Sequence, residues 1–474
     1  MAPEQLPPTE GTLMWRAQEF IRIIDSGNRA DMRKYAIKNF APDFLKVPIE
    51  EHIGFFSWIQ DTTRGVELHS IQDVKPNEVT LLLKRKLTDG WMAFVVSTET
   101  EAPYRITDFR LLPSKPPPDT GPSRKLSHKE IAQELQAMMN KLVDADVFSG
   151  AMLLAKDGLP IFTGAYGMAN KDFNVANQID TKFNLGSMNK MFTAVAIAQL
   201  VEGGQLSFDD SLSSFLPDFP DSAAAEKIKI KHLLTHTAGL GGYFSQRWKD
   251  SARRLYRTVE DMMKLAAADE KLLFEPGTQW QYSNTGMLVL GKVIEIVTGQ
   301  RYYDYVRNHI HQPTGMFNTD CYELDKVNPN LAIGYDKQIT DDDVFFRNNI
   351  FEHVMRGGPH GGGYSTVEDL LKFDLALRSN KLVGAEYVKL LLSTKPELNA
   401  PHFGYGFGVD PELQIAGHSG GFMGISANMD MFLGTGWVAI VMSNYSGIAF
   451  LVSQKMRDLV QSDVRHYGHT VIIG

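Results

Sequence analysis

Ser187 and Lys190 lie three residues apart at the start of the Ala- and Leu-rich run FNLGSMNKMFTAVAIAQL, residues 183–200. Helical residues at positions i and i+3 share a face, so the two side chains can touch. A serine hydroxyl needs a base at hydrogen-bond distance before it attacks near neutral pH, and a buried lysine loses its proton readily. Gly186 suits a close backbone approach. The stretch predicts a nucleophilic serine with an amine partner; the alternative is an N-cap serine with a solvated lysine.

A second candidate pair is Tyr282 and Asn284, within FEPGTQWQYSNTGMLVLG, residues 274–291. The two residues are two apart, so an extended or turning backbone directs both side chains to one side. A phenol can relay a proton between the serine and a leaving group when a nearby cation lowers its pKa. The amide of Asn284 can hydrogen-bond a substrate carbonyl or hold the lysine. Taken alone, the pattern favours the alternative, which is a core tyrosine with a turn asparagine.

The third candidate segment is IAGHSGGFMGISANMDMF, residues 415–432, in which His418 stands at the entry to a predicted pair of strands. The glycines at Gly420 and Gly421 let a substrate lie alongside the backbone. The N–H of Gly421 can pair with that of Ser187 to form an oxyanion hole at a helix N-terminus. This segment therefore predicts the substrate-binding strand.

Two rival sites compete with this interpretation. Residues 417–421 also fit Gly-x-Ser-x-Gly, the nucleophile elbow of α/β-hydrolases, with Ser419 as the nucleophile. That fold needs a helix directly after the serine, whereas apolar residues continue to alternate here. His232 and His236 are spaced as in a zinc-binding helix, but the residue after the first histidine is leucine where glutamate would be needed. We therefore expect no metal and no organic cofactor.

Composition limits the class of protein. The chain has 474 residues, of which 43% are hydrophobic and 22% charged, so it can build two or three domains. The net charge of −8, with both signs mixed, argues against a nucleic-acid surface. Cys321 is the single cysteine, which excludes an intramolecular disulfide. No apolar run is long enough to span a bilayer and no signal peptide is visible. The chain as given is expected to be cytoplasmic, or periplasmic or secreted if a leader was removed.

Three regions are expected along the chain. The Pro-rich segment 113–127, which contains PSKPPPDTGPSRK, predicts a stiff linker. Before it, residues 1–112 change from helical patterns over 12–59 to strand patterns from about Val66. The expected strands are 79–87, 92–100 and 104–113. Helices followed by an antiparallel sheet predict a small α+β domain, which resembles an NTF2-like cone by pattern.

The third region, residues 128–474, has strands near both ends and mostly helices and loops between them. The expected elements are a helix over 128–143, a hairpin of 151–156 with 159–167, strands over 425–434 and 437–444, and a helix over 448–460. Strands at both ends of one region predict a single antiparallel sheet flanked by helices, with a helical domain inserted. The fold class is therefore α/β or α+β.

Taken together, the motifs resemble the serine hydrolases of the class C β-lactamase and penicillin-binding-protein superfamily. The matching segments are HLLTHTAGL (232–240), FEPGTQWQYSN (274–284), GGGYSTVEDLLKF (361–373) and GHSGGFMG (417–424). The resemblance spans roughly residues 128–462 and implies a three-layer, transpeptidase-like sheet domain beside a helical domain, with the site between them. It also implies the roles of single residues: Ser187 as acylated nucleophile, Lys190 as its proton partner, Tyr282 as general base and acid, Asn284 as a substrate contact and His418 on the substrate-side strand.

One departure from the family pattern bears on the substrate. β-Lactamases of this type usually have lysine where this chain has His418, and that lysine binds the substrate carboxylate. A mostly neutral histidine attracts a carboxylate more weakly, and the histidine form resembles class VIII esterases and D-amino-acid-specific peptidases. We therefore expect hydrolysis of a small carboxylic ester or an amide or peptide. The alternatives are a β-lactamase or D-Ala-type carboxypeptidase, and a penicillin-binding-like protein with little turnover. The oligomeric state stays open.

Overall fold

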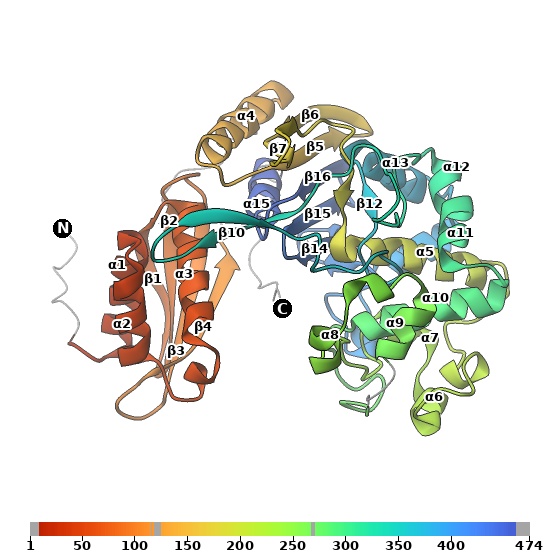
Figure 1. Ribbon diagram of the computed structural model, residues 1–474, viewed down its shortest axis with the longest axis horizontal. Helices are drawn as coiled ribbons and strands as arrows, with labels where there is room; N and C mark the ends of the chain where they lie inside the picture. The colour runs from red at the N-terminus through yellow and green to blue at the C-terminus, as the bar shows by residue number, and fades with distance from the viewer. Residues whose placement is uncertain (1–8, 115, 118–124, 267–270, 461–474) are drawn as a thin grey trace. The chain divides into compact units, whose positions relative to one another are not determined.

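The computed structural model describes residues 9–114, 116–117, 125–266 and 271–460 (Figure 1). The described chain forms two compact units. The first contains the residues up to Val147 together with Lys337–Phe346, and the second contains Phe148–Asp336 and Arg347–Val460.

In the first unit, three helices precede a four-stranded antiparallel sheet with the order β1-β2-β3-β4. Phe20 of the first helix stacks on Phe94 of the sheet with ring centroids 4.5 Å apart. The ring centroid of Phe109 also lies 4.5 Å from that of Phe20. These aromatic contacts join helices and sheet into one core, which has the predicted α+β content, whereas the predicted domain bounds stay a prediction. The elements are α1 (Leu13–Ser26), α2 (Arg29–Asn39), α3 (Ile49–Thr63), β1 (Val66–Lys75), β2 (Glu78–Arg85), β3 (Trp91–Thr98) and β4 (Ile106–Pro113). The NTF2-like topology stays a prediction.

The helix α4 (His128–Asp144) also belongs to the first unit. It begins with a capping box, in which Ser127 Oγ accepts from the Glu130 N–H and the Glu130 carboxylate accepts from the Ser127 N–H. Such a box satisfies backbone donors that a helix N-terminus leaves free. Residues 118–124 of the predicted linker lie outside the described residues.

Sequence analysis did not predict a hairpin that lies, in the sequence, between the two segments of the second unit. It consists of β10 (Tyr335–Ile339) and β11 (Val344–Asn348), and residues 337–346 belong to the first unit. The Arg29 guanidinium donates to the Asp341 carboxylate over 2.9 Å. The acidic run at 341–343 forms the exposed turn of this hairpin, and within it Asp341 is paired with Arg29.

The second unit contains a six-stranded antiparallel sheet with the order β13-β14-β15-β16-β5-β6. Its strands are β5 (Gly150–Lys156), β6 (Leu159–Tyr166), β13 (Gly408–Asp410), β14 (Ile415–Phe422), β15 (Ile425–Phe432) and β16 (Trp437–Ser443). Leu153 of β5 pairs with Ile440 of β16, so strands nearly 300 positions apart are direct neighbours (Figure 1). This confirms the prediction of one sheet assembled from the two ends of the region.

Both faces of this sheet are covered, which explains why every residue of β15 and β16 is buried. On one face, Arg457 of α15 forms two hydrogen bonds of 2.6 and 2.7 Å with Asp430 of β15. On the other face, Met429 joins the core that includes Phe373 of α13 and the helical region. The helices are α5 (Lys190–Glu202), α6 (Ser222–Lys227), α7 (Ile230–Leu234), α8 (Gln246–Asp250), α9 (Val259–Ala266), α10 (Asn284–Thr298), α11 (Tyr302–Val306), α12 (Gln312–Thr314), α13 (Val367–Arg378), α14 (Ala385–Leu392) and α15 (Ala449–Val460).

The remaining strands of the second unit are short. They are β7 (Met168–Asn170) paired with β8 (Val175–Ala176), and β9 (Phe183–Asn184) paired with β12 (Tyr364–Ser365). The second pair leads directly into the turn that carries Ser187, so it helps to position the candidate nucleophile.

Candidate active site

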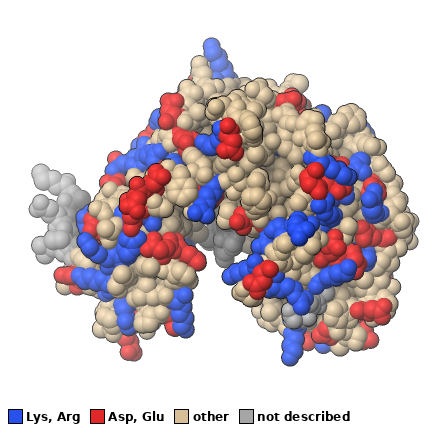
Figure 2. All heavy atoms as spheres, in the orientation of Figure 1, with Lys and Arg blue, Asp and Glu red and all other residues tan. Residues whose placement is uncertain are grey.

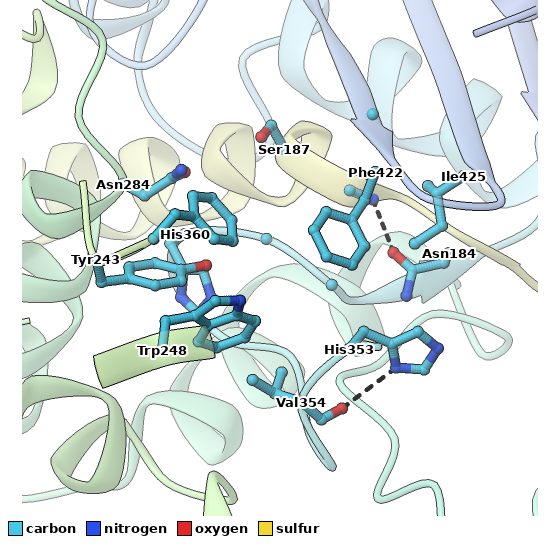
Figure 3. Close-up of a pocket in the computed structure, with 15 residues that line it drawn as sticks. Asn184, Ser187, Tyr243, Trp248, Asn284, His353, Val354, His360, Phe422 and Ile425 are labelled. Atoms are coloured by element: carbon cyan, nitrogen blue, oxygen red, sulfur yellow. Dashed lines mark hydrogen bonds between the residues drawn. The ribbon is translucent and has the colours of Figure 1, made fainter. Parts of the chain in front are cut away.

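Ser187 lies in a 3₁₀ turn, Gly186–Asn189, that runs directly into the helix α5. The side chain of Asn184 accepts a hydrogen bond of 2.9 Å from the Gly186 N–H and holds the entry to the turn (Figure 3). Gly186 has a φ of +50°, in the left-handed region that favours glycine. The turn therefore adopts a backbone that few other residues would accept at this position.

The strand β14 passes directly against this turn. A Cβ atom at Gly420 would lie 1.9 Å from the carbonyl oxygen of Leu185 and 3.0 Å from the Ser187 nitrogen. Only glycine permits this approach, which places the Gly421 backbone beside the nucleophile turn. The run of glycines in β14 thus has a packing reason in addition to its predicted role in binding.

Lys190, the first residue of α5, is fully buried. Its helix is apolar on almost every side, so the long side chain cannot reach water. The amine nitrogen lies 2.9 Å from Ser187 Oγ and 2.8 Å from Asn284 Oδ1, and it also hydrogen-bonds the His360 carbonyl oxygen. Burial lowers the pKa of Lys190 well below its usual value because a charged ammonium loses its hydration there.

These three neighbours determine how a neutral amine is oriented. Such an amine has two N–H donors and one lone pair, while the oxygens of Asn284 and His360 can only accept. With both N–H groups on those two oxygens, the lone pair is left for the Ser187 hydroxyl. This is the arrangement that a general base needs to receive the serine proton.

Tyr282 and Asn284 flank the residue that caps the helix α10. The cap is Ser283, whose side chain accepts from the Gly286 N–H over 2.9 Å and donates to the Gly241 carbonyl over 2.7 Å. This fixed turn brings Tyr282 to the nucleophile, with the Lys190 nitrogen 4.9 Å from the tyrosine ring centroid. Both members of the Tyr-x-Asn pair therefore reach the serine–lysine pair.

The ionisation of Tyr282 differs from the expectation. Sequence reasoning required a nearby cation that lowers the pKa of the phenol. Burial instead raises the pKa of Tyr282, and a hydrogen bond with Ser187 offsets only part of this rise. Because its pKa is raised, Tyr282 is a protonated phenol at neutral pH and can donate a proton.

The structure places His418 beside Tyr282, with ring centroids 6.3 Å apart. The side chain is buried, and Nδ1 is within hydrogen-bond distance of the Ser419 carbonyl. Burial and the proximity of Lys190 lower the pKa of His418 to about 3, so the ring is neutral at pH 7. His418 is not among the described residues that line the cavity at Ser187. Its predicted contact with substrate stays a prediction.

A cavity of about 220 Å³ opens at Ser187 (Figure 3). Three of the predicted residues, Ser187, Asn284 and Gly421, are in its wall. Lys190, Tyr282 and Gly420 lie behind that wall and touch the serine or its turn. The complete lining is Asn184, Gly186, Ser187, Tyr243, Phe244, Trp248, Asn284, His353, Val354, His360, Gly361, Gly362, Gly421, Phe422 and Ile425.

Sequence reasoning missed the apolar wall of this cavity. It is formed by Tyr243, Phe244 and Trp248 from one segment, with Val354, Phe422 and Ile425. The available signal was the density of aromatic residues in GGYFSQRW, residues 241–248. His360 also lines the cavity, and the contact of its backbone carbonyl with Lys190 had no sequence signature.

The rival sites do not have the geometry they require. Ser419 lies in the middle of β14, paired with Asn428, and the strand continues to Phe422 with no helix directly after the serine. His232 Nδ1 accepts a hydrogen bond from the Lys229 N–H, as a local structural contact. Among the described residues, no group of three or more His, Cys, Asp and Glu side chains is placed to hold a metal ion.

The surface adds two observations. Basic and acidic side chains are intermixed on the face shown in Figure 2. Within the described residues, no helix combines the length and apolar character needed to cross a membrane.

Fold and site together define the class of this protein, which is a serine hydrolase of the β-lactamase and penicillin-binding-protein superfamily. Residues 131–460 match the model of the family described as Beta-lactamase, and the chain belongs to that family.

Individual relatives support this assignment. A penicillin-binding protein of Bacillus subtilis is 29% identical over 329 residues, which cover 66% of this chain and 71% of that protein. The crystal structure of a penicillin-binding protein from Bacillus halodurans is similar with a TM-score of 0.60 and 29% identity, over 71% of this chain and all of that one. A D-stereospecific amidohydrolase from Streptomyces gives 0.57 and 25%, over 71% and 98%.

Proposed function

We propose that this protein hydrolyses carboxylic esters or amides through an acyl-enzyme on Ser187, with Lys190 as the base in its neutral form. The observation that supports this most directly is the fully buried amine, which lies 2.9 Å from Ser187 Oγ and contacts two further oxygens that can only accept. A burial that makes the ammonium unfavourable also makes the amine ready to take a proton.

Acylation then proceeds with the following proton movements. Ser187 Oγ transfers its proton to Lys190 Nζ and attacks the substrate carbonyl carbon. The N–H groups of Ser187 and Gly421 stabilise the oxyanion that forms. Tyr282 donates its phenolic proton to the leaving group as the bond to carbon breaks, and the proton on Lys190 restores the phenol. The products of this step are the free alcohol or amine and an ester of Ser187.

Deacylation reverses the same movements with water in place of the leaving group. The pair formed by Tyr282 and Lys190 removes a proton from water, which attacks the acyl carbonyl. The proton then returns to Ser187 Oγ as the carboxylic acid leaves. All of these groups stay within the cavity wall or directly behind it.

The charge of the site supports neutral esters and amides over β-lactams and carboxyl-terminal peptides. Among the described residues that line the cavity, none carries a positive charge. His418, which stands where β-lactamases usually have a lysine, has a pKa of about 3 and stays neutral. A substrate carboxylate would therefore enter the site without a partner, which is unfavourable.

A kinetic experiment tests this proposal. Mixing the protein with p-nitrophenyl butyrate should give sustained release of nitrophenol, with a burst equal to one product per active site if deacylation is the slower step. Steady turnover at a rate at least ~100-fold above the buffer reaction is expected. A burst without subsequent turnover would instead indicate the penicillin-binding-like alternative, and neither burst nor turnover with any ester or amide would contradict the proposal.

The pH dependence should report Lys190 and not the histidines. Burial lowers the pKa of His360 and of His418 to about 3, so neither gains a proton between pH 5 and 9. The rate constant kcat/KM should rise with pH through the lowered pKa of Lys190, because only the neutral amine accepts the serine proton. His418→Gln should keep this acidic limb in place and lose less than the ~100-fold that a general acid–base group contributes. Disappearance of the limb in that variant would show that His418 is the titrating base.

A further inference from the structure

We infer that the cavity beside Ser187 binds the acyl group of the substrate. This acyl group is uncharged and ends in an aromatic ring or a branched alkyl group. This inference rests on the proposed function and adds a substrate class to it. Three observations support it: the apolar wall, the contacts that hold the rings of that wall in place, and the fact that the acyl group stays bonded to Ser187 while the leaving group departs.

The floor of the pocket is aromatic and closely packed. Tyr243 and Trp248 are buried, with ring centroids 5.3 Å apart, and the Tyr243 ring meets the edge of His360 at 5.1 Å. The guanidinium of Arg253 lies 3.9 Å from the Trp248 ring centroid and donates to the Trp248 and Ser251 carbonyls. Because these rings are held before a substrate arrives, binding an apolar group there costs little ordering.

The rim of the pocket is formed by two phenylalanine rings from different segments. Phe244 and Phe422 lie nearly parallel, at an angle of 17° with centroids 6.0 Å apart. Phe244 is 48% exposed and Phe422 is half-buried, so both rings keep apolar surface that a substrate can cover. Figure 3 shows Phe422 and Ile425 across the cavity from Tyr243 and Trp248.

The direction of the reaction assigns this space to the acyl group. After the first step the acyl group is bonded to Ser187, while the leaving group departs and water enters along the same path. The walled part of the cavity must therefore hold the part of the substrate that stays. An apolar wall also suits a group that remains bound while a water molecule is admitted to its carbonyl.

The size of the cavity limits the acyl group. An apolar protein cavity of ~150 Å³ accommodates a benzene molecule. The cavity of about 220 Å³ therefore has room for a phenyl ring together with a short methylene link to the carbonyl. A charged acyl group of similar length would find no cation among the described lining residues.

A series of p-nitrophenyl esters with one leaving group tests the inference on the wild-type protein. We expect kcat/KM for the phenylacetate to exceed that for the acetate by about tenfold or more, since apolar contacts in a pocket discriminate on this scale. The half ester of succinic acid, similar in length to butyrate but charged, should be poorer than butyrate by about tenfold. Equal values across the series, or a preference for acetate or succinate, would overturn the inference.

A matched pair of variants identifies the wall that is responsible. Phe244→Ala should lower the ratio of kcat/KM for the phenylacetate to kcat/KM for the acetate by about tenfold. Phe317→Ala removes a phenylalanine that is 77% exposed and outside the cavity lining, so it should change neither ester. Equal losses for both esters in Phe244→Ala would contradict an acyl pocket at this wall.

The same series separates this inference from the proposed function. Activity that depends on Ser187 but shows no aromatic preference would overturn only the substrate class. Activity that persists in Ser187→Ala would overturn the proposed function and this inference with it.

Discussion

Replacing Ser187 by alanine is expected to reduce ester hydrolysis by about 10³-fold or more, because losing a nucleophile removes the covalent pathway. Folding should be unaffected. Ser187 is only half-buried, and its hydrogen bonds join it to Lys190 and Tyr282 rather than to the core. The measurement is steady-state hydrolysis of p-nitrophenyl butyrate, with thermal unfolding of both proteins as the check on folding.

The matched control is Ser419→Ala, which removes the rival nucleophile in the middle of β14. Ser419 is exposed and paired with Asn428 in a regular ladder, so this variant should retain hydrolysis. Residual activity above ~1% of wild type in Ser187→Ala would contradict the assignment. Loss of activity in Ser419→Ala, with activity retained in Ser187→Ala, would identify Ser419 as the nucleophile.

Replacing Lys190 by methionine is expected to reduce hydrolysis by about 10³-fold or more. The variant loses the amine that accepts the serine proton and then returns a proton to Tyr282. Methionine has a similar length and no charge, so it can occupy the apolar surroundings of α5. Lys190→Arg is the informative partner. It keeps a donor at the site but stays charged and offers no lone pair, so it should be equally inactive and also destabilised by its buried charge.

Lys190→Met should also change how the free energy of unfolding depends on pH, and the sign of this change follows from the lowered pKa of Lys190. Between its folded and unfolded pKa values this group binds more protons in the unfolded state, so wild-type stability rises with pH there. Lys190→Met lacks that contribution. The free energy of unfolding of the variant minus that of wild type should therefore be largest at acidic pH and shrink towards pH ~10. A difference that does not vary with pH in denaturant titrations would show that Lys190 is not perturbed by burial.

Sequence reasoning reached the sheet, and it selected candidate site residues that the folded chain brings together, because both leave local signatures. The strands near residues 151–156 and 425–444 show apolar patterns that their burial in the sheet explains. Ser187, Lys190 and Tyr282 were found through short spacings, which a helix start and a capped turn then convert into contacts. Short-range spacing is a reliable guide when one element carries the whole motif.

The parts that could not be predicted depend on contacts between distant segments. The carbonyl of His360 faces Lys190 from 170 positions away, and any residue type would supply the same oxygen. The pocket wall joins Phe244 to Phe422 through tertiary packing that no periodicity encodes. The raised pKa of Tyr282 depends on burial, which the spacing of Tyr-x-Asn does not reveal. The fold and the candidate nucleophile were therefore accessible from sequence, whereas the pKa shifts and the pocket wall required the folded chain.

If acyl groups are carried on Ser187, a covalent adduct can be located on this residue. The protein is incubated with a p-nitrophenyl ester and quenched in acid within the burst. The mass of the intact protein is measured first, and the masses of its peptides are measured after digestion. The account predicts a mass increase equal to one acyl group, confined to the peptide that contains Ser187 and absent from Ser187→Ala. Acylation of a different residue, or hydrolysis by the wild type with no adduct at Ser187 under any quench time, would contradict it.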